Sequence, residues 1–126
     1  MKKIIASDKA PGAIGPYSQA VLAGNLLFIS GQIPLDPVSM EMIGATAAEQ
    51  AEQVFKNMKA ILQEAGLGFE HVVKTTVLLK NIGDFAAVNE VYALQFNGDY
   101  PARAAYEVAN LPKNALIEIE AIAVKP

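Results

Sequence analysis

ALIEIEAIAV, residues 115–124, alternates between two kinds of side chain with the two-residue period of a β-strand. One face of this strand would be entirely apolar, and it consists of Ile117, Ile119, Ala121 and Ala123. The other face mixes two carboxylates with apolar residues, and it consists of Leu116, Glu118, Glu120, Ile122 and Val124. We expect the apolar face to pack on helices and the mixed face to meet a neighbouring subunit or a cleft.

Four other segments carry strand signals, namely alternation or β-branched residues bounded by turn residues. These segments are YSQAVLA (17–23), LLFISGQIP (26–34), HVVKTTVLL (71–79) and ARAAYEV (102–108). Gly24 and Asn25 form a turn that would join the first two segments into a hairpin. The turn LPKN, residues 111–114, would join ARAAYEV to the final strand, so we expect a hairpin at each end of the chain.

Two helices are predicted between these strands. Thr46 and Glu49 have the spacing of a capping box, and Gly66 supplies a stop signal. Apolar residues with helical periodicity lie between them: Ala51, Val54, Phe55, Met58, Ile61, Leu62 and Ala65. A second helix would be capped by Asp84 and would run through FAAVNEVYALQF, residues 85–96. Before the first helix, LDPVSMEMIG, residues 35–44, is predicted to be a loop.

Strands grouped around two helices predict an α+β fold in which one mostly antiparallel sheet packs on both helices. A length of 126 residues without repeats or linkers favours one domain over residues 1–126. Hydrophobic residues make up 52% of the chain and the mean hydropathy is +0.27, which is more apolar side chain than a small monomer readily buries. We therefore expect a homo-oligomer with an apolar interface.

Composition excludes several classes of function. The net charge is −3 and no basic cluster exceeds Lys2 and Lys3, so nucleic acid is not an expected partner. Signal-peptide and membrane-spanning stretches are lacking, which predicts a soluble, cytoplasmic protein. The chain has no cysteine and a single histidine, His71, which we expect at the surface; thiolate chemistry and a histidine-rich metal site are excluded.

Arg103 is the only arginine, and every other cationic side chain is a lysine. Its planar fork of donors matches a carboxylate in two places, whereas an ammonium is a single hydrated charge. Arg103 would share a strand face with two smaller or flexible neighbours, Ala105 and Glu107. The alternative is a structural ion pair with Glu107 or, across the terminal hairpin, with Glu118 or Glu120; the sequence leaves both interpretations open.

Glu118 and Glu120 are either a solvated strand edge or, among Leu116, Ile122 and Val124, partly buried carboxylates with raised pKa values suited to proton transfer. Other polar side chains stand on turns, strands or the second helix, where hydrogen bonds to a small ligand are commonly mounted. They are Tyr17, Ser30, Gln32, Asn89 and Tyr92.

Four stretches in this order resemble the RidA/YjgF family of reactive-intermediate deaminases: APGAIGPYSQAV, ISGQIP, FAAVNEVY and YPARAAYEVANLPKNALIEIEAIAV. The resemblance runs from about residue 10 to the last strand and is weakest over residues 35–50. QFNGDYPAR, residues 95–103, is a few residues shorter than in many members. Membership implies a chorismate-mutase-like α+β fold and a homotrimer whose sheets form a central β-barrel, with clefts at the subunit interfaces.

The resemblance also implies an activity: hydrolysis of short enamine and imine acids of the 2-aminoacrylate and 2-aminocrotonate type to 2-oxo acids and ammonia, without cofactor or metal. Arg103 would bind the substrate carboxylate, and Glu118 would hold and activate the attacking water. Tyr17, Ser30, Gly31 and Asn89 would line the cleft from the adjacent subunit. Ala105 stands where many bacterial members have cysteine, so only its backbone would contact the ligand.

Two other functions use the same residues. A trimer that binds 2-oxo acids and reports to a partner without catalysis would need an almost identical cleft. Glu118 separates the two, because a pure binder does not need a proton acceptor there. RNA cleavage, proposed for relatives of this family, is disfavoured here by the net charge of −3 and the single arginine.

Overall fold

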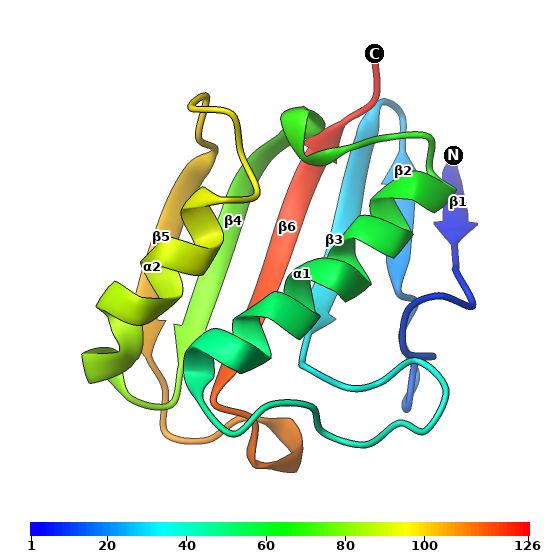
Figure 1. Ribbon diagram of the computed structural model, residues 1–126. Helices are drawn as coiled ribbons and strands as arrows, with labels where there is room; N and C mark the ends of the chain where they lie inside the picture. Colours follow the sequence, from blue (N-terminus) through cyan, green and yellow to red (C-terminus); the bar gives the residue numbers. More distant parts are fainter.

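The computed structural model describes residues 1–126 as one six-stranded sheet with two helices on the same face (Figure 1). The helices are α1 (Ala47–Glu64) and α2 (Phe85–Ala93), and three short 3-10 turns cover Phe69–His71, Ile82–Asp84 and Pro112–Asn114. The strands are β1 (Lys2–Ile5), β2 (Ala20–Ala23), β3 (Leu26–Gln32), β4 (Val72–Leu79), β5 (Ala102–Glu107) and β6 (Ile117–Val124).

The sheet has the order β1-β2-β3-β6-β4-β5, and only the β4–β5 pair is parallel. The predicted hairpin at the amino-terminal end is confirmed, since β2 and β3 pair antiparallel around Gly24 and Asn25. The predicted terminal hairpin is wrong, because β4 lies between β5 and β6. Burial accords with this order: alternate residues of β6, in the middle of the sheet, are buried, whereas β5 has no buried residue and lies at an edge.

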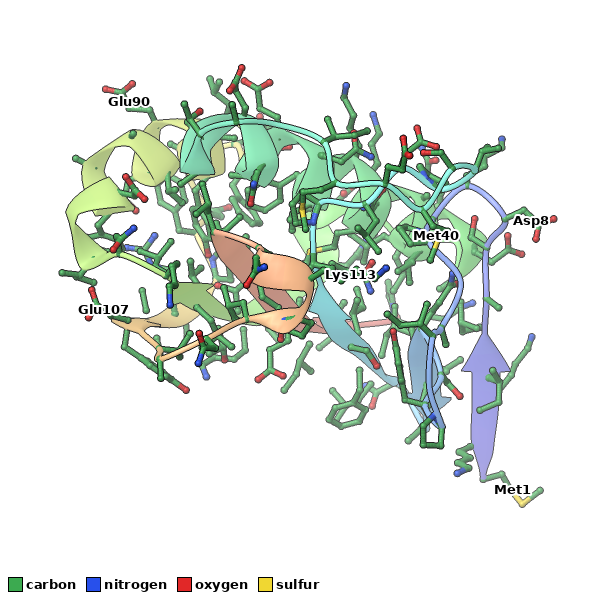
Figure 2. All side chains as sticks on the ribbon, turned by 90° about the horizontal axis from the view of Figure 1, so that it is seen from below. Met1, Asp8, Met40, Glu90, Glu107 and Lys113 are labelled. Atoms are coloured by element: carbon green, nitrogen blue, oxygen red, sulfur yellow. The ribbon has the colours of Figure 1, made fainter.

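The faces predicted for the last strand are confirmed. Ile117, Ile119, Ala121 and Ala123 are all buried, and they belong to one 26-residue hydrophobic core between the sheet and the helices. Figure 2 views the molecule at right angles to Figure 1, with the helices on one side of the sheet and side chains projecting freely from the other. No helix covers that second side, which we call the open face.

Helix α1 forms as the sequence predicts. The Glu49 amide donates to Thr46 Oγ1 at 3.2 Å, and Glu49 Oε1 accepts from the Thr46 amide at 3.0 Å, which completes the capping box. The helix ends before Gly66, whose φ of 77° lies in the left-handed region that glycine adopts readily. Its predicted apolar residues are all buried.

Helix α2 differs from its prediction at both ends. Asp84 precedes the helix but makes no side-chain capping bond, because it closes the 3-10 turn Ile82–Asp84. The helix ends at Ala93 rather than near residue 96. The backbone amides of residues 94–96 donate to carbonyls three residues earlier in the chain, instead of four. This tighter turn brings the Phe96 ring onto Phe69 and Tyr92 in the core, with centroid distances of 5.7 and 5.1 Å.

Strand β1 was not predicted, since KKII carries too few apolar residues to signal a strand on its own. It pairs with β2 at the far edge of the sheet. The predicted loop over residues 35–44 is confirmed apart from one isolated bridge between Leu35 and Met42. Neither helix combines the length and apolarity that crossing a membrane would need.

Candidate functional site

Arg103, on edge strand β5, points to the helix side of the sheet and is held by α2. Its Nη1 donates to Asn89 Oδ1 at 2.7 Å. Its guanidinium carbon lies 4.8 Å from the ring centroid of Tyr92 and 5.0 Å from that of Phe85. Two aromatic faces and one amide therefore fix the plane of the guanidinium while several of its N–H groups stay free.

No carboxylate pairs with Arg103. The single ion-pair contact in the structure joins His71 to Glu70, and Glu107 instead accepts a hydrogen bond from the Ile82 amide at 2.9 Å. The alternative of a structural ion pair is therefore wrong. The guanidinium instead lines an open pocket of about 470 Å³, together with Asn89, Tyr92, Ala93, Tyr100 and Pro101.

The residues that orient Arg103 come from two neighbouring elements. Phe85, Asn89 and Tyr92 lie four and three residues apart on α2, so they share one helix face. The Tyr92 hydroxyl lies 2.7 Å from Thr75 Oγ1 in the core, and Thr75 is the β4 register partner of Arg103. Sequence reasoning singled out Asn89 and Tyr92 but missed Phe85 and Thr75, although the helical spacing of Phe85 was a usable signal.

Glu118 lies on the open face of β6, beside Glu120. Its carboxylate packs directly against Gly31 of β3. Partial burial raises the pKa of Glu118 above its ordinary value of 4.5, and the neighbouring Glu120 carboxylate raises that pKa further. The interpretation of Glu118 as a partly buried carboxylate is thus confirmed, whereas Glu120 is exposed.

Ser30 and Gly31 belong to a bulge in β3 beside Glu118. Ser30 Oγ donates to the Ser18 carbonyl at 2.6 Å, and the Ser30 amide donates to the Gln19 carbonyl at 2.9 Å. These two hydrogen bonds hold the backbone of the bulge in place. The Ser30 hydroxyl keeps its lone pairs to accept a hydrogen bond. Tyr17 is exposed, and it lines a small cavity of about 30 Å³ together with Gly31.

The predicted site residues therefore form two clusters on opposite faces of the sheet. Thr75, which packs on α2, pairs with Arg103 and with Ala121, so the side chain of Arg103 lies on the helix side. Leu78 of β4 pairs with Glu118 of β6. Because Leu78 follows Thr75 by three residues, the side chains of Leu78 and Glu118 point to the open face. Within one chain, Arg103 and Glu118 cannot contact the same small molecule.

Asn89 was predicted to line the intersubunit cleft with Tyr17, Ser30 and Gly31, and within one chain it does not lie with those three residues. Its side chain bonds to Arg103 from α2, so it belongs to the other cluster. Ala105 pairs with Val77 on the Arg103 face and packs partly against the core, which leaves the free backbone edge of β5 as its route to a ligand.

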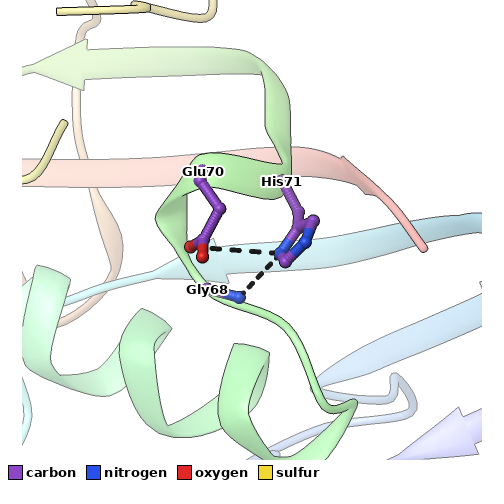
Figure 3. A network of polar contacts seen from close by, with 3 residues as sticks. All are labelled: Gly68, Glu70 and His71. Atoms are coloured by element: carbon purple, nitrogen blue, oxygen red, sulfur yellow. Dashed lines mark hydrogen bonds and ion pairs between the residues drawn. The ribbon is translucent and has the colours of Figure 1, made fainter. Parts of the chain in front are cut away.

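His71 belongs to a local turn between α1 and β4 (Figure 3). Its Nδ1 accepts from the Gly68 amide at 3.0 Å and lies 4.0 Å from a Glu70 carboxylate oxygen. The side chain is 27% exposed, so it is less accessible than predicted. No group of three or more histidine, cysteine or acidic residues lies together in a way that would hold a metal ion.

Comparison with known proteins assigns the chain to a family. The family model described as Endoribonuclease L-PSP matches residues 7–125. The chain belongs to this family. The match includes both clusters of predicted site residues and every strand except β1, because it begins at residue 7 and β1 ends at Ile5.

Relatives within the L-PSP family carry deaminase and RidA names. The human protein named 2-iminobutanoate/2-iminopropanoate deaminase is 54% identical over 125 residues, covering 99% of this chain and 91% of the human chain. The structure of RidA from Psychrobacter sp. PAMC 21119 is 49% identical with a TM-score of 0.93, covering 97% of this chain and 98% of that one. E. coli TdcF with bound serine is 46% identical with a TM-score of 0.93, covering 98% and 99%.

Proposed function

We propose that the protein hydrolyses short-chain enamine and imine acids, of the 2-aminoacrylate and 2-aminocrotonate type, to 2-oxo acids and ammonia. The observation that carries this proposal is the unpaired Arg103 guanidinium, oriented by Asn89 and two rings at the wall of a pocket. The name of the human relative supports the reaction, and the serine bound to E. coli TdcF supports a ligand of amino-acid size.

The proposed site is shared between two copies of the chain in a homotrimer with a central barrel. Its support is the separation of Arg103 and Glu118 onto opposite faces, because one copy supplies only half of the groups the reaction needs. The open face also carries exposed apolar side chains that a second copy would cover, namely Ile4, Leu26, Phe28 and Tyr106. A single sheet with one core supports one domain over residues 1–126.

Binding would fall to the Arg103 cluster. The guanidinium offers the substrate carboxylate two parallel hydrogen bonds, and a charge-assisted bond contributes roughly 1.5–3 kcal/mol. Asn89 holds the guanidinium in plane, so little side-chain entropy is lost when a ligand arrives. For a molecule of six or seven heavy atoms, such a clamp would supply most of the affinity.

Hydrolysis would fall to Glu118 of the neighbouring copy. An enamine first gains a proton on its terminal carbon and becomes an iminium ion. The oxygen of a water then bonds to the iminium carbon, the electron pair of the C=N π bond moves to the nitrogen, and the Glu118 carboxylate accepts a proton from that water. The carbinolamine loses ammonia after its nitrogen is protonated, its hydroxyl gives up a proton, and the C=O bond of the 2-oxo acid forms. A carboxyl whose pKa is raised by burial suits both accepting and returning a proton.

The test generates 2-aminoacrylate in situ with a serine dehydratase and follows pyruvate release. The wild type should accelerate release over buffer, Arg103→Ala should not, and Arg103→Lys should lose about tenfold or more, since a point charge replaces neither the fork nor the stacking. Equal rates for wild type, Arg103→Ala and buffer would refute the proposal. If the wild type binds 2-oxobutanoate without turnover of the imine acid, and Glu118→Gln keeps or tightens that affinity, the non-catalytic binding trimer is favoured instead.

A further inference from the structure

The space for the Glu118 carboxylate exists because residue 31 has no side chain. A Cβ built on Gly31 would lie 2.8 Å from Cδ and 3.1 Å from Cγ of Glu118, and closer still to Oε2. Real Cβ atoms essentially never approach a neighbour within 3.0 Å, so any side chain here would displace the carboxylate. Gly31 is also not among the glycines with positive φ, which means that its backbone is open to other residues.

The backbone beneath the carboxylate is built as a bulge. Ile29 pairs with Ala121 and Gln32 with Ile119, so three steps along β3 span two steps along β6. The extra residue brings Gly31 against the Glu118 side chain. Because Ser30 is bonded to the residue 18 and 19 carbonyls, the strand is fixed and the carboxylate is the partner that would move.

We propose that Gly31 is a positioning residue for catalysis: its missing side chain seats the Glu118 carboxylate in the orientation from which it directs water. This inference rests on the proposed deaminase function. This role of Gly31 is separate from any contact between its backbone and a ligand, because it depends on the Glu118 carboxylate filling the space that a side chain at residue 31 would occupy. It also separates catalysis from binding, since Arg103 lies on the other face of the sheet.

The experiment measures kcat and KM of Gly31→Ala with a continuously generated imine acid, and its affinity for 2-oxobutanoate by calorimetry. We expect kcat to fall about tenfold or more, with KM and affinity within about twofold of wild type, because the carboxylate clamp is intact. Gly83→Ala is the matched control, since its added Cβ would meet nothing within 4 Å and its backbone φ is not positive. This control should keep wild-type kinetics.

A double-mutant cycle distinguishes positioning from general damage. In the Glu118→Gln background, Gly31→Ala should lower kcat by no more than about twofold further, because the group that it positions is already lost. An equal loss in both backgrounds would overturn the inference, as would wild-type kcat for Gly31→Ala or a change confined to KM. If Gly31→Ala does not fold, Gly31→Ala/Glu118→Ala should fold, since the three atoms nearest the new Cβ belong to Glu118; failure of the double variant also overturns the inference.

The activity of the wild-type protein distinguishes a failure of the proposed deaminase function from a failure of the proposed role of Gly31. If wild type releases no 2-oxo acid above buffer, the proposed function fails. If wild type is active and Arg103→Ala is not, while Gly31→Ala matches wild type, only the positioning role of Gly31 fails.

Discussion

Arg103 is oriented by contacts that begin in the hydrophobic core. The Tyr92 ring stacks under the guanidinium, and the Tyr92 hydroxyl is anchored on buried Thr75. Asn89 fixes the same group from a second direction. The proposed substrate clamp on an exposed edge strand thus has its direction set by buried residues of α2 and β4, which is the usual way a site gains rigidity.

Two substitutions at Tyr92 test the roles of its ring and its hydroxyl separately. Tyr92→Phe keeps the ring but leaves the buried Thr75 hydroxyl without its partner, so the free energy of unfolding should fall by about 1–3 kcal/mol while KM stays near wild type. Tyr92→Leu removes the ring and should raise KM as well. Urea unfolding and steady-state kinetics measure both effects. Equal KM values for the Phe and Leu variants would show that stacking does not orient Arg103.

Glu118 makes stability depend on pH in a defined direction. Its pKa is raised in the folded protein, first by burial and then by Glu120, so between 4.5 and that raised value the folded state binds more protons than the unfolded state. The free energy of unfolding therefore falls as pH rises through this window. Glu118→Gln should flatten the profile there and stabilise the protein at neutral pH. Urea titrations from pH 4 to 7 test this, and an unchanged slope in Glu118→Gln would contradict it.

Elements with local signals were predictable, whereas those set by packing were not. The capping box, the stop at Gly66 and the alternation of residues 115–124 each lie within one element, and each was confirmed. The end of α2 depends on Phe96 reaching the core, and the position of β5 depends on which strand tolerates an edge. The local sequence pattern carries no signal for either property, so the terminal hairpin and the helix end were predicted wrongly.

Helix α1 offers a direct measure of one such local signal. Thr46→Ala removes the side-chain oxygen that accepts from the Glu49 amide, and it should lower the free energy of unfolding by about 1 kcal/mol. Thr46→Ser keeps a hydroxyl and should lose much less. Both follow from urea unfolding at pH 7. A Ser variant as unstable as the Ala variant would show that the capping bond contributes nothing.

At the scale of the whole molecule, the proposed site is divided. Sequence and resemblance predicted roles for Arg103 and Glu118 separately, but they did not predict that the two side chains project from opposite faces of the sheet. That property follows only when the strand order is known, because β4 between β5 and β6 fixes which alternate residues share a face. Asn89 belongs to the Arg103 cluster because its side-chain oxygen accepts a hydrogen bond from the guanidinium.

The measurement that tests the shared site most directly is complementation between two variants that each lack one group of the proposed site. Arg103→Ala and Glu118→Gln are co-expressed with different tags, and the mixed oligomers are purified and assayed for pyruvate release. If each site of the proposed homotrimer takes its arginine from one copy and its glutamate from the next, every purified mixed trimer holds one complete site of three. Its activity should therefore be about a third of the wild-type value. Mixed oligomers no more active than the two variants assayed separately would contradict the account.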